Sequence, residues 1–344
     1  MIFHSSGVAL HWRWLLSGAL VVLCLCAVIS ISFGAVSLSL SEIGLWLQGK
    51  SSLQTQIIIE DIRLPRMLLA LCIGALLALC GTVTQGLFRN PLADPSLIGV
   101  SAGASAGASI VIVLLSQLHW NMLGVPVVSV GAFIGGLIAV MVVYRIATGV
   151  NGTSVATMLL AGIAITFLTG SLSSILEFYA DDEMLRRISL WRMGGLDAAN
   201  YTHAMIAASV LIVLLVLLPQ TAKALDAFLL GESEARHLGI DVDKIKYILI
   251  VSVAVGVGVA VALAGSIAFV GLVVPHMLRM LVGPAHRFLL PLSAIGGAVL
   301  LLLSDVLSRT LVAPTELPVG ILTAFLGAPL FISLLRHRHE YGMR

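Results

Sequence analysis

Charged side chains are scarce along this sequence. The 19 basic and 17 acidic residues make up 10% of the 344 positions, and hydrophobic residues make up 59%. A soluble protein usually carries about 25% charged residues, so this chain has too few to cover a surface in water. The net charge of +2 gives no reason to expect a nucleic-acid partner. We therefore expect an all-α integral membrane protein, with residues 1–344 forming a single domain in the lipid bilayer.

Residue patterns for catalysis and metal binding are also lacking. No Ser/His/Asp arrangement and no metal-ligand spacing stands out, so we expect no catalytic residue, no metal site and no permanently bound cofactor. The four cysteines all fall inside apolar runs, which favours buried thiols over a disulfide framework. They are Cys24, Cys26, Cys72 and Cys80.

Apolar stretches of near-bilayer length recur along the whole chain. They are residues 14–36, 67–87, 96–118, 122–143, 154–176, 203–218, 247–265, 267–282, 288–304 and 317–335. This pattern predicts about ten transmembrane helices, with a tight turn at Gly265 and Ser266 between the seventh and the eighth. Glycines spaced four residues apart, Gly103/Gly107 and Gly131/Gly135, predict closely packed helix pairs.

Basic residues set the expected orientation. Ten spans place both termini on one side of the membrane, and with that side inside, the inner segments hold twelve Lys and Arg residues against seven outside. The excess predicts cytoplasmic termini, a cytoplasmic loop at 219–246 and a segment at 177–202 on the outer side. The span interiors carry almost no ionisable side chain, whereas ion-coupled carriers generally need such groups. A stand-alone secondary transporter is therefore the weaker alternative.

The 219–246 loop concentrates charge, with nine charged residues in 28 positions. Leu225, Phe228 and Leu229 share one face of an expected short helix, which Gly231 ends. A second short helix is expected over 232–238, with a Glu232/Arg236 pair and Gly239 as its stop. Two short helices between long apolar spans indicate a contact site for another protein, although an ordinary solvated loop has the same composition.

Several blocks follow one another in a fixed order between residues 63 and 329. They are RLPR at 63–66, GLFRNPLADP at 86–95, LIGVSAG at 97–103, LGE at 230–232, GSIAFVGL at 265–272, ELPVG at 316–320 and GAP at 327–329. With these blocks the chain resembles the FecCD/BtuC-type permeases, the membrane subunits of bacterial ABC importers for iron-siderophores, haem and cobalamin.

The resemblance implies a type II importer architecture in a bacterial inner membrane, which makes 177–202 a periplasmic segment. Two permease subunits form a homodimer, with two cytoplasmic ATPase subunits below that use ATP and one periplasmic binding protein above. It implies that the permease itself is not an enzyme. It also implies that the short helices of the 219–246 loop dock on the ATPase through Leu225, Phe228, Leu229, Gly231, Glu232, Ala235, Leu238 and Gly239.

On the outer side, the resemblance implies that Arg63, Arg66 and Arg309 pair with glutamates of the binding protein. Bidentate pairing of arginine with carboxylates fits such an interface. The alternative for each is an arginine that only anchors the end of a helix.

The segment at 177–202 is most similar to the haem-importing branch. Haem carries two propionates and a flat apolar ring, and Arg186, Arg187, Trp191 and Met193 offer matching chemistry along a substrate path. A membrane-surface helix whose charges only meet water is the alternative. The sequence therefore predicts a haem permease, with an iron-siderophore or cobalamin permease as the alternative within the family.

Overall fold

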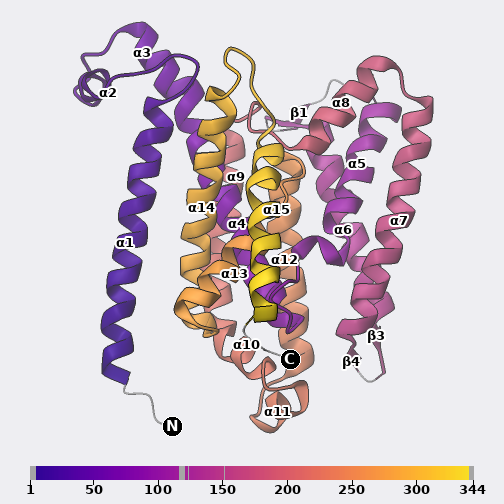
Figure 1. Ribbon diagram of the computed structural model, residues 1–344. Coiled ribbons are helices and arrows are strands. Elements are labelled where there is room, and N and C mark those ends of the chain that lie inside the picture. The colour runs from indigo at the N-terminus through magenta and orange to yellow at the C-terminus, as the bar shows by residue number, and fades with distance from the viewer. Residues whose placement is uncertain (1–4, 116–120, 123, 151, 341–344) are drawn as a thin grey trace.

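The computed structural model describes residues 5–115, 121–122, 124–150 and 152–340 (Figure 1). Ten apolar helices of ten or more residues dominate this part, and seven of them are long enough to cross a membrane. The ten are α1 (Ser5–Ser32), α4 (Leu64–Leu87), α5 (Val100–Leu114), α6 (Val127–Ala147), α7 (Val155–Tyr179), α9 (Tyr201–Leu217), α12 (Val242–Ala264), α13 (Val270–Val282), α14 (His286–Thr310) and α15 (Val319–Glu340). Each corresponds to one predicted span, so the all-α membrane fold is confirmed and the ten helices agree roughly with the predicted number of spans.

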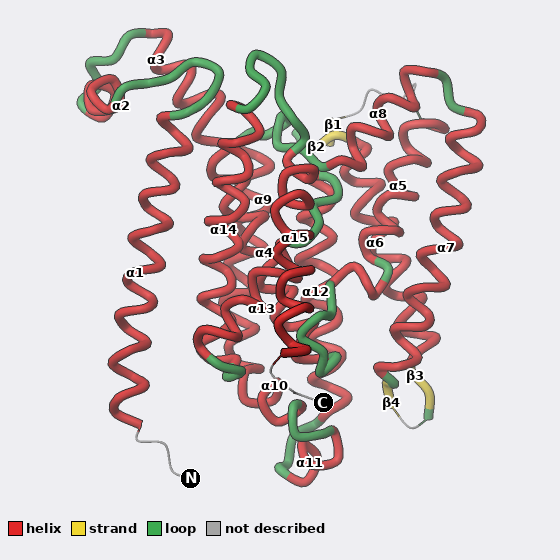
Figure 2. Tube along the Cα trace, in the orientation of Figure 1, coloured by secondary structure: helices red, strands yellow, loops and turns green. Residues whose placement is uncertain are grey.

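Short elements other than η2 gather at the two ends of the bundle (Figure 2), whereas η2 lies within it beside Leu77 of α4. They are α2 (Leu40–Leu47), α3 (Leu53–Ile57), the π-helix η1 (Ile58–Arg63), the 3-10 helices η2 (Pro95–Ile98) and η3 (Leu218–Thr221), α8 (Asp182–Met193), α10 (Ala222–Phe228), α11 (Glu232–His237), and the strand pairs β1 (Asn121–Met122) with β2 (Val125–Pro126) and β3 (Thr148–Gly149) with β4 (Gly152–Thr153). α2, α3 and α8 lie at one end, called the α2–α3 end. α10 and α11 lie at the other, called the α10–α11 end (Figure 1).

Both terminal helices run to the α10–α11 end, where α1 begins and α15 ends (Figure 1). The terminal residues 1–4 and 341–344 lie outside the described residues, as do 116–118 of the predicted third span and 123 of the predicted fourth. At the opposite end, α2 begins with a capping box in which Ser39 and Glu42 exchange hydrogen bonds. Those bonds, the Ser39 hydroxyl first, lower the pKa of the Glu42 carboxyl.

Glycine and proline set two helix boundaries. Gly265 ends α12 with a φ of +67°, so the predicted turn between the seventh and eighth spans is confirmed.

The second span extends well before residue 67, because α3, η1 and α4 form one continuous helix from Leu53 to Leu87. Its wider π-turn lies just before Pro65, whose ring clashes with a regular α-helical turn. This turn carries Arg63 into the bundle.

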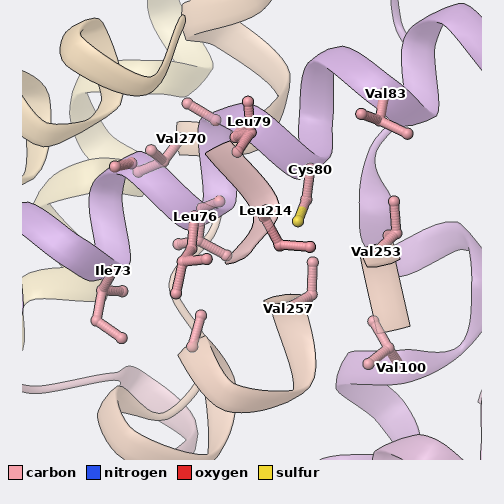
Figure 3. Close-up of a cluster of buried hydrophobic side chains, with 14 of the residues drawn as sticks. Ile73, Leu76, Leu79, Cys80, Val83, Val100, Leu214, Val253, Val257 and Val270 are labelled. Carbon is pink, nitrogen blue, oxygen red and sulfur yellow. The ribbon is translucent and has the colours of Figure 1, made fainter. Parts of the chain in front are cut away.

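The core is built around α4, which is buried along nearly its whole length. It packs against α9, α12, α13 and α14. Its side chains meet residues of four other helices (Figure 3). The cluster includes Ile73, Leu76, Leu79, Cys80 and Val83 of α4, Val100 of α5, Leu214 of α9, Val253 and Val257 of α12, and Val270 of α13. By contrast, α1 and α7 expose most of their surface, as helices that face lipid do.

The four glycines predicted to let helices pack closely do so against each other. A Cβ on Gly103 would lie 2.5 Å from the carbonyl oxygen of Gly135, and a Cβ on Gly107 would lie 2.2 Å from that of Gly131. Any larger side chain would therefore force α5 and α6 apart.

Gly107→Leu is expected to destabilise the protein by about 1–3 kcal/mol, because overpacking a tight contact shifts backbone and side chains. Gly170→Leu on α7 is the matched control, since a Cβ there meets no described atom within 4 Å. Thermal unfolding of both variants in detergent checks the expectation. Equal unfolding midpoints would show that the close α5–α6 contact does not govern the stability of the protein.

Candidate functional site

Three arginines and two carboxylates form a buried charged cluster at the α2–α3 end. Arg66 donates from Nε to Oδ1 of Asp305 and from Nη1 to Oε2 of Glu316, both at 2.7 Å. Nε of Arg309 lies 3.0 Å from Oδ2 of Asp305, an ion-pair distance. Asp305 is completely buried, whereas the Glu316 side chain is 41% exposed. The cluster joins α4, α14 and the loop before α15.

The same cluster holds the end of α1. Carbonyl groups at the C-terminus of a helix lack partners within the helix and carry partial negative charge, so cations bind there. Arg63 and Arg309 supply those cations, and Arg63, unlike Arg309, has no carboxylate partner among the described residues. The accepting carbonyls are those of Ser30, Ile31, Ser32, Phe33 and Val36.

The three arginines expected to pair with glutamates of the binding protein, Arg63, Arg66 and Arg309, are buried and bonded within this chain, and their pairing with a binding protein stays a prediction. Their exposed fractions are 4%, 6% and 6%. The physical reason is that a guanidinium near the membrane needs acceptors for its five donors, and this chain supplies them internally. Only Glu316 brings the cluster to the surface.

At the α10–α11 end, two short helices form where the sequence predicts them. Gly231, with φ +130°, separates α10 from α11, and Gly239, with φ +82°, follows α11. Leu225 and Phe228 of α10 are 0% and 1% exposed, and Ala235 of α11 is fully buried. The expectation that these three side chains contact a partner protein is therefore wrong, because they pack inward on their own chain.

The surface that α10 and α11 leave open consists of other residues. Leu230 is 69% exposed and Leu238 is 65% exposed, and Leu229 is partly exposed. We call Leu229, Leu230 and Leu238 the leucine patch. Exposed leucines outside the spanning helices are available for contact with another protein.

α10 is fixed to the first residue of α14 by a carboxylate. Oδ1 of Asp226 accepts from the backbone N–H of His286 at 2.9 Å and lies 2.7 Å from Nδ1 of its ring. A carboxylate at a helix N-terminus satisfies an unpaired N–H and interacts favourably with the helix dipole. Gly86 of α4 allows this approach, because a Cβ there would lie 2.6 Å from Nε2 of His286. Asp226 thus caps α14 from a different helix.

α11 is fixed by a buried lysine. Nζ of Lys246 on α12 donates to Oε2 of Glu232 and to the carbonyl oxygen of Thr153, both at 2.6 Å. The predicted Glu232/Arg236 pair is wrong, because Arg236 pairs with Asp243 at 2.8 Å instead. Movement of α10 and α11 would therefore be transmitted to α12, α14 and the β3–β4 hairpin.

Sequence reasoning missed these anchoring residues. Lys246 and Asp226 read as solvated loop charges, and nothing local distinguishes them from their neighbours. Asp305 had a usable signal, because a carboxylate at the end of an apolar span needs a partner.

The four residues predicted to line a substrate path do not share one site. Arg187 and Trp191 line a cavity of about 280 Å³ between α8, α6 and α12, together with Asp197 and His203. Met193 lines a separate cavity of about 570 Å³ between α8 and α15. Arg186 is exposed and lines neither. The reason is the helical period of α8, which turns these side chains to different sides.

Comparisons with known proteins agree with this membrane architecture. The model of the FecCD transport family matches residues 21–337. The hemin transport system permease protein HmuU of Yersinia pestis is 43% identical over 95% of this chain and 97% of its own length. The cobalamin import system permease protein BtuC of Halobacterium salinarum is 44% identical over 82% of this chain and 74% of its own length.

A solved structure agrees as well. A metal-chelate-type ABC transporter in an inward-facing conformation is 33% identical, with a TM-score of 0.85, and the match covers 94% of this chain and 99% of that one. The fold is that of a multi-pass ABC importer permease. The chain belongs to the FecCD transport family. Permeases of this class are not catalytic, since ATP hydrolysis lies in separate subunits.

Proposed function

We propose that this chain is the permease of an ATP-driven haem importer in a bacterial inner membrane. The observation that carries the proposal is the 43% identity to a hemin permease over 95% of the chain. That likeness also covers 97% of the hemin permease, so it extends over nearly the full length of both proteins.

The proposed assembly is a homodimer with two ATPase subunits and one binding protein. The α10–α11 end faces the cytoplasm, because the predicted inner segments hold twelve of the 19 basic residues. The leucine patch then meets the ATPase, and the anchors at His286 and Lys246 carry its movement into the bundle. The binding protein docks at the α2–α3 end, above the arginine cluster.

Haem chemistry supports a role for α8. Arg186 and Arg187 are the adjacent exposed cations at the α2–α3 end, and two subunits supply four. A carboxylate that leaves water needs an opposite charge nearby, or desolvation opposes its entry. Arg187 also lies beside Trp191 in one cavity, which pairs a cation with a flat apolar ring.

The variant Arg186→Ala with Arg187→Ala is expected to slow haem uptake into reconstituted vesicles at least tenfold, because two charge-assisted contacts per subunit are lost. Binding-protein docking and ATPase assembly should remain intact. Lys50→Ala removes another exposed cation at the same end and is the matched control. Unchanged uptake by the double variant would remove these arginines from the path.

Cobalamin import is the second candidate. It is favoured by the 44% identity to the Halobacterium salinarum permease, which covers less of both chains. An iron-siderophore substrate agrees with the metal-chelate-type structure. Haem takes precedence because its relative combines 43% identity with a match over nearly the full length of both proteins.

A further inference from the structure

A groove between α6 and α12 is not used by the proposed transport cycle. The two helices pack side by side, and the groove between them has a volume of about 440 Å³. Each helix contributes residues at i, i+3, i+4, i+7 and i+8, so each presents one continuous stripe. The lining is Leu137, Val140, Met141, Tyr144 and Arg145 on α6, and Tyr247, Ile250, Val251, Ala254 and Val255 on α12.

The groove has one polar end and one apolar end. The helices run in opposite directions, so Tyr144 and Arg145 at the end of α6 lie beside Tyr247 at the start of α12 (Figure 1). The two tyrosine rings lie 5.8 Å apart. All three side chains are therefore at the α10–α11 end. Every other lining residue is aliphatic or methionine and lies farther along the helices from that end.

The groove opens to the outside of the bundle. Met141, Tyr247 and Val251 on its rim are exposed, whereas Val140 and Ile250 at its base are buried. Arg145 is exposed and has no ion-pair partner among the described residues. A free cation and two phenol groups at the membrane boundary, continuous with an apolar channel, match a phosphate head group joined to an acyl chain.

We propose that this groove binds an anionic glycerophospholipid. Arg145 pairs with the phosphate, the hydroxyls of Tyr144 and Tyr247 donate to its oxygens, and an acyl chain lies along the two stripes. The class of lipid is inferred from the residues that line the groove and needs no assumption about orientation. Its placement in the cytoplasmic leaflet rests on the proposed orientation of the α10–α11 end.

Native mass spectrometry of the purified full-length chain tests the proposal, with phosphatidylglycerol and phosphatidylcholine as probes. We expect one phosphatidylglycerol per chain to bind more tightly than phosphatidylcholine. Arg145→Ala should weaken phosphatidylglycerol binding about tenfold, since one charge-assisted contact is lost. Val251→Trp fills the groove from its open side and should weaken both lipids.

Two matched variants complete the test. Arg287→Ala removes an exposed cation at the same end, and Ile138→Trp introduces the same side chain on α6 outside the groove. Both should bind lipid like the unaltered chain. Equal affinity for the two lipids, or an equal effect of Arg287→Ala and Arg145→Ala, would overturn the proposal. Dimer dissociation by Val251→Trp with unchanged lipid binding would assign the groove to a second copy and overturn it as well.

Discussion

Asp305→Asn is expected to destabilise the protein by about 3–5 kcal/mol, which is the effect of leaving buried charges without their partner. Asp305 is fully buried and pairs with both Arg66 and Arg309. Asparagine keeps the shape of the side chain and removes its charge. Arg66 then keeps only the carboxylate of Glu316, and Arg309 loses its ion-pair partner. Denaturant unfolding of the purified chain in detergent measures the change.

Glu316→Gln is the matched control within the same cluster. It removes the charge of a carboxylate that pairs with Arg66 at 2.7 Å, the same distance as for Asp305. The Glu316 side chain, however, is 41% exposed. Water replaces the lost partner there, so the expected cost is only about 0–1 kcal/mol. Similar losses for the two variants would show that burial of Asp305 does not govern the cluster.

Leu230→Asp with Leu238→Asp is expected to weaken retention of the ATPase by at least roughly a hundredfold. Burying a leucine in an interface contributes about 1.5–3 kcal/mol, and a buried aspartate adds a desolvation penalty. Both leucines are exposed in the isolated chain, so the folded structure should be unaffected. A pull-down of the ATPase with the purified permease measures retention.

Leu47→Asp, an exposed leucine of α2 at the opposite end, is the control and should retain the ATPase fully. Leu225→Asp and Phe228→Asp serve a different purpose, since these buried side chains report on folding of the α10 junction. Normal retention by the Leu230/Leu238 double variant would remove the leucine patch from the coupling interface.

Local chemistry made much of the fold predictable from the sequence. Span positions follow from runs of apolar residues, and the breaks at Gly231, Gly239 and Gly265 follow from the backbone freedom of glycine. The close approach of α5 and α6 follows from the glycine spacing. These features need no knowledge of what lies across the bundle.

The sequence does not predict what the apolar face of α10 packs against. The spacing of Leu225 and Phe228 identifies an apolar face, but it does not say whether that face meets another protein or the same chain. The structure buries it against α4 and α14. Helical periodicity therefore located the short helix α10 correctly and assigned its apolar face to the wrong contact.

The arginine cluster shows a second limit. Arg66 and Asp305 are 239 residues apart in the chain, and no local pattern links them. From the sequence, an arginine at the start of a span can pair equally well with another protein or with a carboxylate of its own chain. Only the three-dimensional position of Asp305 distinguishes the two. The same holds for Lys246 and Thr153, which are 93 residues apart.

ATP-dependent uptake of haem into vesicles tests the central claim most directly. The vesicles contain this chain with its ATPase subunit and binding protein, and labelled haem competes with an excess of cobalamin or of a ferric siderophore. We predict that haem accumulates only with ATP and that neither competitor reduces it. Uptake of cobalamin or of the siderophore in place of haem would contradict the haem assignment, and absence of any ATP-dependent uptake would contradict the proposed transport function.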